Sequence, residues 1–400
     1  MHIDTGDTTW ILISTALVMI MTPALALFYG GMVRSKNVLA TVMQSFVSLG
    51  IISILWVIYG YSLAFGPDFH HITGNLDWIF LHHVTEMPYP IYAKTIPHML
   101  FMLFQMMFAV LTPALITGAF AERFKFKSYL VFLVIWFTAV YCPIAHWVWG
   151  QGGWIKNMGG LDFAGGLVVH IASGMSALVA TLMIGKRIGW KKVAIHPHNL
   201  SLTLLGAGLL WFGWFGFNAG SALQANGLAV KAFLNTQVSA GAGALGWIIV
   251  EWIRHKHPTA LGIASGALAG LVSITPAAGF VEPVWAILIG FLGGIGCYFC
   301  VQSKLKLNID DSLDAVGIHG MGGIWGSIAT GIFATNGAIS GNFHLLTVQI
   351  LSTCSTILYS LTVTSLILFA IDKTMGLRVT KDEEVMGLDI TQHGERGYYL

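Results

Sequence analysis

Charged side chains are scarce in this 400-residue sequence: Asp, Glu, Lys and Arg make up only 10% of it, against 56% hydrophobic residues. A soluble domain carries about 25% charged residues, so the composition excludes an ordinary water-soluble protein. The small net charge of +2 gives no indication of a nucleic-acid partner. We therefore predict an integral membrane protein with very little of its chain outside the lipid bilayer.

Cysteine is also rare, and this scarcity excludes two further classes of structure. All four cysteines fall in apolar runs, so neither a disulfide framework nor a metal site is indicated, and we expect no cofactor. Glycine, by contrast, is abundant, with 47 residues. Pairs at four-residue spacing, such as Gly290 and Gly294, indicate helices that pack backbone to backbone.

Long apolar runs recur along the chain, and each is about long enough to cross a bilayer, for which ~20 residues are needed. The eleven runs cover residues 10–29, 38–65, 97–120, 128–149, 164–185, 200–218, 236–253, 259–276, 284–301, 315–334 and 345–371. The predicted fold class is therefore an all-α polytopic membrane protein with eleven transmembrane helices. The first run lacks a basic segment before it, so we interpret it as a retained helix rather than a cleaved signal peptide.

The basic residues fall in alternate connections between these runs. All but three of the 20 Lys and Arg lie on one side, and the exceptions are Lys94, Lys156 and Lys231. The positive-inside rule then places the N-terminus outside and the C-terminus in the cytoplasm of a multi-pass protein of the cell (cytoplasmic) membrane. We expect a transmembrane domain over residues 1–371 and a cytoplasmic regulatory tail over residues 372–400.

Two histidines, His170 and His319, lie deep inside apolar, glycine-rich runs, in GGLVVHIASG and AVGIHGMGG. An ionisable side chain at membrane depth is costly unless it has a partner or lines a cavity, so each is a candidate functional residue. The alternative is a hydrogen-bonded pair that only stabilises the bundle.

The positions of the two histidines suggest an internal repeat. They fall on the fifth and tenth helices. Because five crossings end on the opposite side of the membrane, a second unit of five helices would have the inverse orientation. We therefore predict inverted pseudo-repeats over about 10–185 and 200–334, with the eleventh helix added at 345–371, an arrangement typical of transporters. We place the start of the fifth helix near Asp162 and of the tenth near Asp314, so that the imidazoles approach the midplane from opposite sides.

Six segments resemble signature stretches of the ammonium transporter (Amt/Mep/Rh) family, in the expected order along the whole chain. They are FYGGMVRSKNVL, PIAHWVWGQGG, DFAGGLVVHIASG, WFGWFGFNAGSAL, ITPAAG and DAVGIHGMGGIWG. The resemblance implies a transporter of ammonium rather than an enzyme, assembled as a homotrimer in membrane lipid with one pore in each protomer. Trp149 favours the Amt branch, because Rh proteins usually lack that aromatic residue.

The resemblance also implies roles for individual residues. These are outer recruitment of NH4+ at Phe108, Trp149 and Ser221, a stacked gate at Phe108 and Phe217, proton relay at His170 and His319, and an acidic vestibule residue at Asp162. Asp162 stands near the start of a helix, so we favour a role in capping backbone amides over direct contact with ammonium.

These residue types suit ammonium chemically. Aromatic faces attract cations, and a serine hydroxyl accepts an N–H bond, which potassium cannot donate. Because an isolated charge in an apolar medium is very costly, we expect NH4+ to lose its proton, cross as NH3, and pass the proton through the imidazoles. Net movement of charge is the favoured outcome; the alternative is an electroneutral channel for NH3 or CO2.

The tail contains a second resemblance, GLDITQHGERGYYL, to the C-terminal stretch of bacterial and archaeal members that communicates with PII signalling proteins. The matching residues are Asp389, His393, Gly394, Glu395 and Tyr398. A solvated charged tail is the simpler alternative. A further possibility is an ammonium sensor that signals through the tail and a partner. A membrane enzyme is disfavoured, since no HExxH, carboxylate cluster or nucleotide-binding glycine loop is found.

Overall fold

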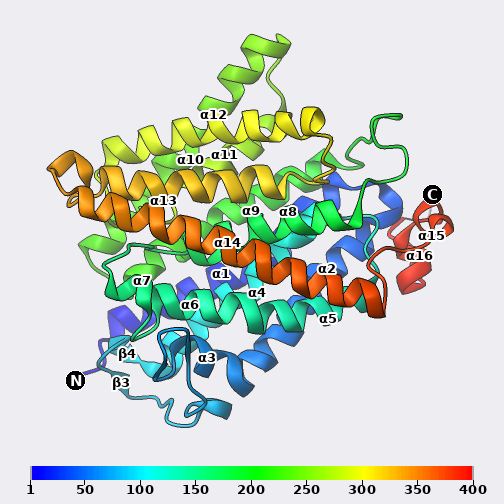
Figure 1. The fold of residues 1–400 in the computed structure, drawn as a ribbon. Coiled ribbons are helices and arrows are strands. Elements are labelled where there is room, and N and C mark those ends of the chain that lie inside the picture. Colours follow the sequence, from blue (N-terminus) through cyan, green and yellow to red (C-terminus); the bar gives the residue numbers. More distant parts are fainter. Residues whose placement is uncertain (1, 399–400) are drawn as a thin grey trace.

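Long helices that run side by side form the body of the protein (Figure 1), and they confirm the predicted all-helical class. The computed structural model describes residues 2–398. The N-terminus and the C-terminal helices lie at opposite ends of the helical bundle. Two short antiparallel hairpins lie in the loop after the second apolar run, formed by β1 (Asp68–Phe69) with β2 (Thr73–Gly74) and by β3 (Pro88–Tyr89) with β4 (Ala93–Pro97).

Sixteen α-helices follow one another along the described chain, and the longest connection, between α3 and α4, contains the two hairpins. Their bounds are α1 (Thr5–Met32), α2 (Val38–Leu55), α3 (Tyr61–Phe65), α4 (His98–Phe120), α5 (Phe126–Trp136), α6 (Cys142–Trp149), α7 (Trp154–Asn157), α8 (Ala172–Ile184), α9 (Leu200–Ala219), α10 (Gly227–His255), α11 (Ala260–Ile274), α12 (Pro283–Leu307), α13 (Met321–Phe333), α14 (Phe343–Thr374), α15 (Lys381–Met386) and α16 (Leu388–His393).

Nine helical segments of the described chain are long and apolar enough to cross a membrane. Helix α11 and helix α13 are shorter and occupy the predicted eighth and tenth runs, so eleven crossings stay a prediction. The predicted bounds 236–253 were wrong, because α10 begins nine residues earlier. The side chain of Asn226 accepts the backbone N–H groups of Leu228 and Ala229 and thereby starts the helix before its apolar run.

Four segments of the described chain have the wider π-helical geometry and interrupt or precede the α-helices. They are η2 (Trp56–Gly60), η4 (Phe137–Tyr141), η5 (Gly166–Ile171) and η7 (Val316–Gly320). Two of them, η5 and η7, contain His170 and His319. Such π-helical turns occur frequently at functional sites.

Glycines allow the backbones of α10 and α12 to approach each other closely. A Cβ atom on Gly294 would lie 2.1 Å from the carbonyl oxygen of Gly243, and one on Gly290 would lie 2.2 Å from that of Ser239. No side chain fits at either distance, so the packing inferred from the glycine spacing is confirmed. Small residues are the usual means by which membrane helices pack together.

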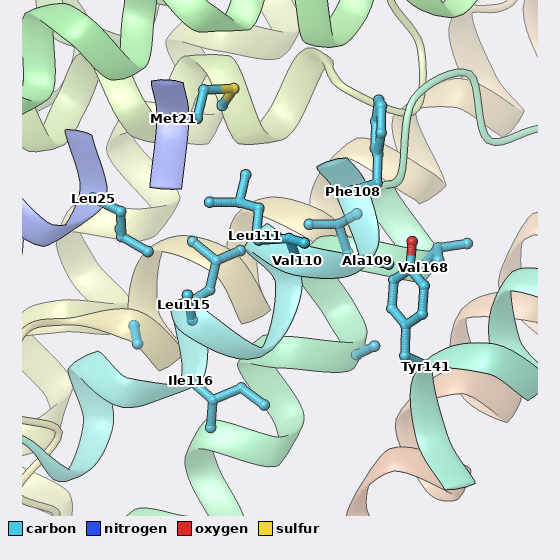
Figure 2. Close-up of a cluster of buried hydrophobic side chains, with 14 of the residues drawn as sticks. Met21, Leu25, Phe108, Ala109, Val110, Leu111, Leu115, Ile116, Tyr141 and Val168 are labelled. Atoms are coloured by element: carbon cyan, nitrogen blue, oxygen red, sulfur yellow. The ribbon is translucent and has the colours of Figure 1, made fainter. Parts of the chain in front are cut away.

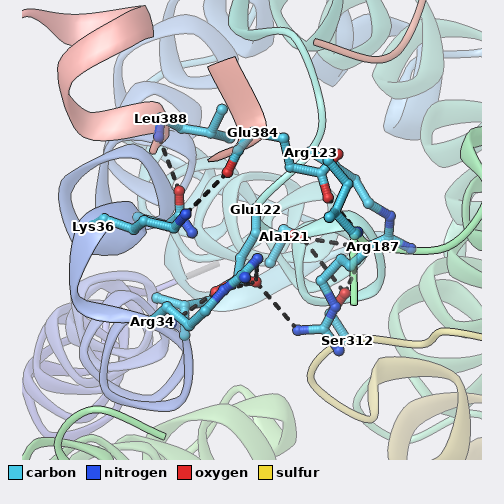
Figure 3. Close-up of polar contacts among 12 residues, drawn as sticks. Arg34, Lys36, Ala121, Glu122, Arg123, Arg187, Ser312, Glu384 and Leu388 are labelled. Atoms are coloured by element: carbon cyan, nitrogen blue, oxygen red, sulfur yellow. Dashed lines mark hydrogen bonds and ion pairs between the residues drawn. The ribbon is translucent and has the colours of Figure 1, made fainter. Parts of the chain in front are cut away.

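A network of buried ion pairs joins the ends of helices near the C-terminal tail (Figure 3). Arg187 binds Asp310 at 2.8 Å and also lies 3.5 Å from Glu122, which in turn binds Arg34 at 2.7 Å. Burial alone would raise the pKa of Asp310, but the hydrogen bonds and charge of Arg187 outweigh burial and lower it. Each of these charges is stable in a buried position only because its partner of opposite sign is present.

We predict that Arg187→Met strongly destabilises the protein, because Asp310 would remain as a buried, unpaired carboxylate. Breaking a buried pair costs about 3–5 kcal/mol. The matched control is Lys231→Met, which breaks the exposed pair between Lys231 and Glu282 and should cost at most about 1 kcal/mol. Thermal unfolding in detergent measures both; equal shifts in the two variants would contradict the importance of the buried network.

Candidate functional site

His170 and His319 lie next to each other in the middle of the bundle. Their Nδ1 atoms are 3.2 Å apart, and their rings are inclined by only 14°. Both side chains are buried, with 1% and 7% of their surface exposed. Because one Nδ1 must donate and the other accept, the contact links the two rings in a defined proton arrangement. Within the described residues, Nε2 of His170 has no hydrogen-bond partner.

Close contact between the two helices that carry the histidines holds this pair together. A Cβ atom on Gly174 of α8 would lie 2.3 Å from the backbone nitrogen of Gly320 in η7. The backbones therefore touch one turn after His170 and directly after His319. Any larger residue at position 174 would push η7 away and separate the rings.

Asp162 fixes the start of the helix that carries His170. Its carboxylate accepts the backbone N–H groups of four successive residues at 2.6–3.3 Å, Gly165 to Val168. Burial raises the pKa of Asp162, and these four hydrogen bonds oppose that rise. Gly165 has φ of 118°, which residues with side chains rarely adopt. The structure thus places Asp162 as a helix cap, with both oxygens occupied by backbone donors.

An equivalent cap precedes His319. The carboxylate of Asp311 accepts the N–H groups of Ala315 and Val316 at 3.2 and 2.8 Å. Asp311 stands eight residues before His319, the same separation as between Asp162 and His170. The prediction that this helix starts near Asp314 is confirmed, because the first helical residue is Ala315 and the carbonyl oxygen of Asp314 accepts the N–H of Ile318 at 2.9 Å. Asp314 itself has a left-handed φ of 63° and forms an ion pair with Lys304.

A small apolar cavity adjoins the histidine pair. Its volume is about 10 Å³, which is the lower limit for one water-sized molecule. Apart from the imidazoles, aliphatic and aromatic side chains form most of its wall, among them Leu25, Leu111 and Leu115. Figure 2 shows the two leucines of α4 on the side that faces α1. Trp214 also lines the cavity and stacks on His170 at 5.5 Å between ring centroids; sequence analysis missed it, although it is one helical turn before Phe217.

The rings of Phe108 and Phe217 stack on each other close to His170. Their centroids are 4.3 Å apart with an inclination of 30°, and both side chains are fully buried. Phe217 also lies 6.0 Å from the ring of His170. The stacked arrangement inferred from the resemblance is therefore present.

A larger cavity of about 310 Å³ lies on the other side of these phenylalanines. Trp149 and Ser221 both line it, and Trp149 meets Phe108 edge to face at 6.0 Å. The indole N–H of Trp149 donates to the carbonyl oxygen of Asp162 at 2.9 Å. Tyr92, Gln105 and Lys156 line the same cavity. The sequence signalled none of these three, because they lie outside the motifs.

The tail residues lie against the opposite end of the bundle. Asp389 of α16 accepts the backbone N–H of Ala40, in the first turn of α2, at 2.8 Å, and Tyr398 forms a hydrogen bond with His198 at 2.9 Å. The ring of His393 packs on Phe126. Gly394 ends α16 with φ of 70°, and Glu395 follows with its N–H bonded to Asp389. The tail is thus docked on the bundle rather than fully solvated.

Comparisons with known proteins agree on one family. The model of the Ammonium Transporter Family matches residues 9–398. The ammonium transporter of Bacillus subtilis is 53% identical, with 98% of each chain covered, and Amt1 of Archaeoglobus fulgidus is 48% identical over 98% of this chain and 99% of its own. The crystal structure of Saccharomyces cerevisiae Mep2 superposes with a TM-score of 0.90 at 36% identity, covering 95% of this chain and 88% of Mep2.

One solved structure in the comparison has a different description. A protein described as a sensor Amt protein superposes with a TM-score of 0.90 at 31% identity, covering 97% of this chain and 98% of its own. The same fold is therefore found in a protein named for sensing. Fold similarity alone does not separate the two activities.

We predict that Asp162→Ala lowers stability, because four backbone N–H groups would lose a charged acceptor. Hydrogen bonds to charged groups contribute about 1.5–3 kcal/mol each, so the expected loss is at least about 3 kcal/mol. The midpoint of thermal unfolding in detergent measures it. Asp77→Ala, which removes an exposed carboxylate from the hairpin loop, is the control and should shift the midpoint little. An Asp162→Ala protein as stable as the wild type would contradict the capping role.

Proposed function

The chain belongs to the ammonium transporter family, whose members are membrane transporters rather than enzymes, and we propose that it moves ammonium by separating it into ammonia and a proton. The observation that carries this proposal is the contact of His170 with His319 beside a one-molecule apolar cavity. A buried imidazole pair offers hydrogen bonds to a small neutral molecule and a route for a proton. A plain opening for gas would need neither.

Recruitment begins in the 310 Å³ cavity. The hydroxyl of Ser221 donates to the carbonyl of Phe217 at 2.8 Å, so its oxygen lone pairs stay available to accept an N–H bond. Trp149 and Phe108 present ring surfaces beside it, and aromatic faces attract a desolvated cation by about 2 kcal/mol. A tetrahedral cation with four N–H donors uses both features, whereas potassium uses only the second.

The stacked phenylalanines and the small cavity behind them then impose the selection. An ion that enters an apolar space of this size loses its hydration without replacement, at a cost far above thermal energy. Ammonium avoids that cost by leaving its proton behind, and sodium and potassium have none to leave. We assign the gate to Phe108 and Phe217 on this ground.

The proton follows through the imidazoles, so that net charge crosses with each ammonia. The 3.2 Å separation between Nδ1 atoms is a hydrogen-bond distance. Among the described residues the Nε2 atom of His170 has no hydrogen-bond partner, and His170 lines the small cavity. We therefore propose electrogenic transport. The alternative, electroneutral passage of NH3 or CO2, would use the same cavity but give no current.

We further propose that the two halves of the chain are inverted repeats in an eleven-helix protein, with the N-terminus outside and the C-terminus inside. Equal eight-residue separations from Asp162 to His170 and from Asp311 to His319 support the repeat, and the placement of the termini at opposite ends of the bundle supports the odd number of crossings. By family resemblance we propose a homotrimer in the cytoplasmic membrane. The mass of the detergent-solubilised particle tests the number of subunits.

The docked tail supports a role in regulation. Glu384 of α15 is bonded to Lys36, just before α2, and Asp389 of α16 to Ala40 in the first turn of α2. Tyr398 is bonded to His198 in the loop before α9. A partner that binds the tail would therefore also reach the inner end of the pore. We propose a PII signalling protein as that partner. The solved sensor Amt structure makes sensing through the tail the second candidate function.

For proteoliposomes on a supported membrane, we predict a transient current after an ammonium jump and none after an equal potassium jump. In His170→Ala the relay is broken and the cavity is enlarged, so the potassium response should rise toward that of ammonium. His83→Ala, in the exposed outer loop, is the control and should behave as the wild type. Ammonia flux without any current in the wild type would overturn electrogenic transport.

For the tail, we predict that Asp389→Ala abolishes capture of a purified PII protein by the immobilised transporter, because α16 loses its bond to α2. Asp382→Ala removes an exposed carboxylate from α15 and should leave capture unchanged. The measurement is the retained PII protein on a pull-down resin. Equal retention by both variants and the wild type would show that the docked tail does not form the partner site.

A further inference from the structure

Lys156 places a positive charge at the entrance for a positively charged substrate. It lies on the short helix α7 and lines the 310 Å³ outer cavity together with Trp149 and Ser221. Like charges in one cavity repel each other. A lysine in this position therefore works against recruitment of a cation, and its presence needs an explanation.

The contacts of Lys156 are those that a free ammonium ion would seek. Its Nζ donates to the carbonyl oxygen of Trp149 at 2.8 Å and lies 5.4 Å from the centre of the Tyr92 ring. A carbonyl acceptor and an aromatic face are two of the features that attract NH4+. The side chain thus holds an ammonium group, tethered to the protein, within the cavity that receives the substrate.

The charge of Lys156 is not neutralised nearby. Among residues 2–398, no carboxylate forms an ion pair with it. The one carboxylate that lines the same cavity, Asp162, accepts four backbone N–H groups instead. By contrast Lys231, another basic residue of the predicted outer side, is paired with Glu282 at 2.6 Å.

We propose that Lys156 sets the affinity of the outer site, as a tethered ammonium group that competes with and repels the substrate cation. This inference rests on the proposed function, since it concerns recruitment of NH4+ at that cavity. Its consequence is a site that fills only at higher external ammonium than the aromatic and hydroxyl groups alone would require. Lys156 does not contact the phenylalanine gate or the histidines, where the proposed passage of ammonia and the proton takes place. The maximal rate should therefore not depend on Lys156.

The test is uptake of radiolabelled methylammonium by proteoliposomes that contain the full chain. Lys156→Gln and Lys156→Met remove the charge and should lower KM about threefold to tenfold, with maximal uptake unchanged. Lys156→Arg keeps the charge and should keep the wild-type KM. The matched control is Lys94→Gln, which removes the same charge from an exposed position outside the cavity and should leave KM close to the wild-type value.

Salt provides a second, independent readout. The difference in KM between wild type and Lys156→Gln should shrink as sodium chloride is raised from about 10 mM to about 1 M, because screening shortens the reach of the charge. A KM that is unchanged in both neutral variants would overturn the inference. So would an equal loss of maximal uptake in all three variants, Lys156→Arg included, which would mark Lys156 as a structural residue.

Failure of the proposed function has a different signature. If the wild type shows no saturable uptake at all, transport itself is contradicted, and quenching of tryptophan fluorescence by ammonium in the purified protein still tests Lys156. Tighter binding by Lys156→Gln than by wild type supports the inference; equal binding overturns it. Trp149→Leu, which removes an aromatic face from the same cavity, should weaken binding and so move KM in the opposite direction.

Discussion

The cost of an unpaired charge in an apolar environment governs every part of this protein. At the end of the bundle near the tail, charges are buried only in pairs, as Arg187 with Asp310. Between the outer cavity and the histidines, the path is lined by phenylalanine rings and a small, largely apolar cavity. The same cost that makes Arg187 dependent on Asp310 underlies our proposal that the path excludes ions that cannot lose a proton.

Backbone geometry positions the imidazoles of His170 and His319 at the centre of the bundle. Each histidine lies in a π-helical segment, and each segment begins beneath an aspartate that satisfies its free N–H groups. Gly174 of α8 then lets the helix that continues from His170 touch η7. The 3.2 Å contact between Nδ1 atoms is therefore the result of several backbone features, none of which contacts a substrate.

The larger cavity contains groups that attract a cation and one group that repels it. The outer cavity offers aromatic faces and a free hydroxyl oxygen, but it also contains the amine of Lys156. Attraction and repulsion in one cavity allow its affinity to be adjusted without altering the selective step further in. At the other end of the bundle, the tail is bonded to the first turn of α2 through Asp389.

Hydropathy determined the helical class and the approximate spans, and the motifs singled out His170, His319, Phe108, Phe217 and Trp149 as candidate site residues. These properties are local, and a chain in a bilayer has few alternatives to helices. Hydropathy did not predict the start of α10 at its Asn226 cap or the capping role of Asp311 before His319, because a polar cap lies outside the apolar run that it begins. Only the tertiary structure decided that Trp214 stacks on His170, that Asp162 has no free oxygen, and that Lys156 reaches the outer cavity. Those contacts join residues that are far apart in the sequence, so they follow from how the helices pack and cannot be deduced from one helix alone.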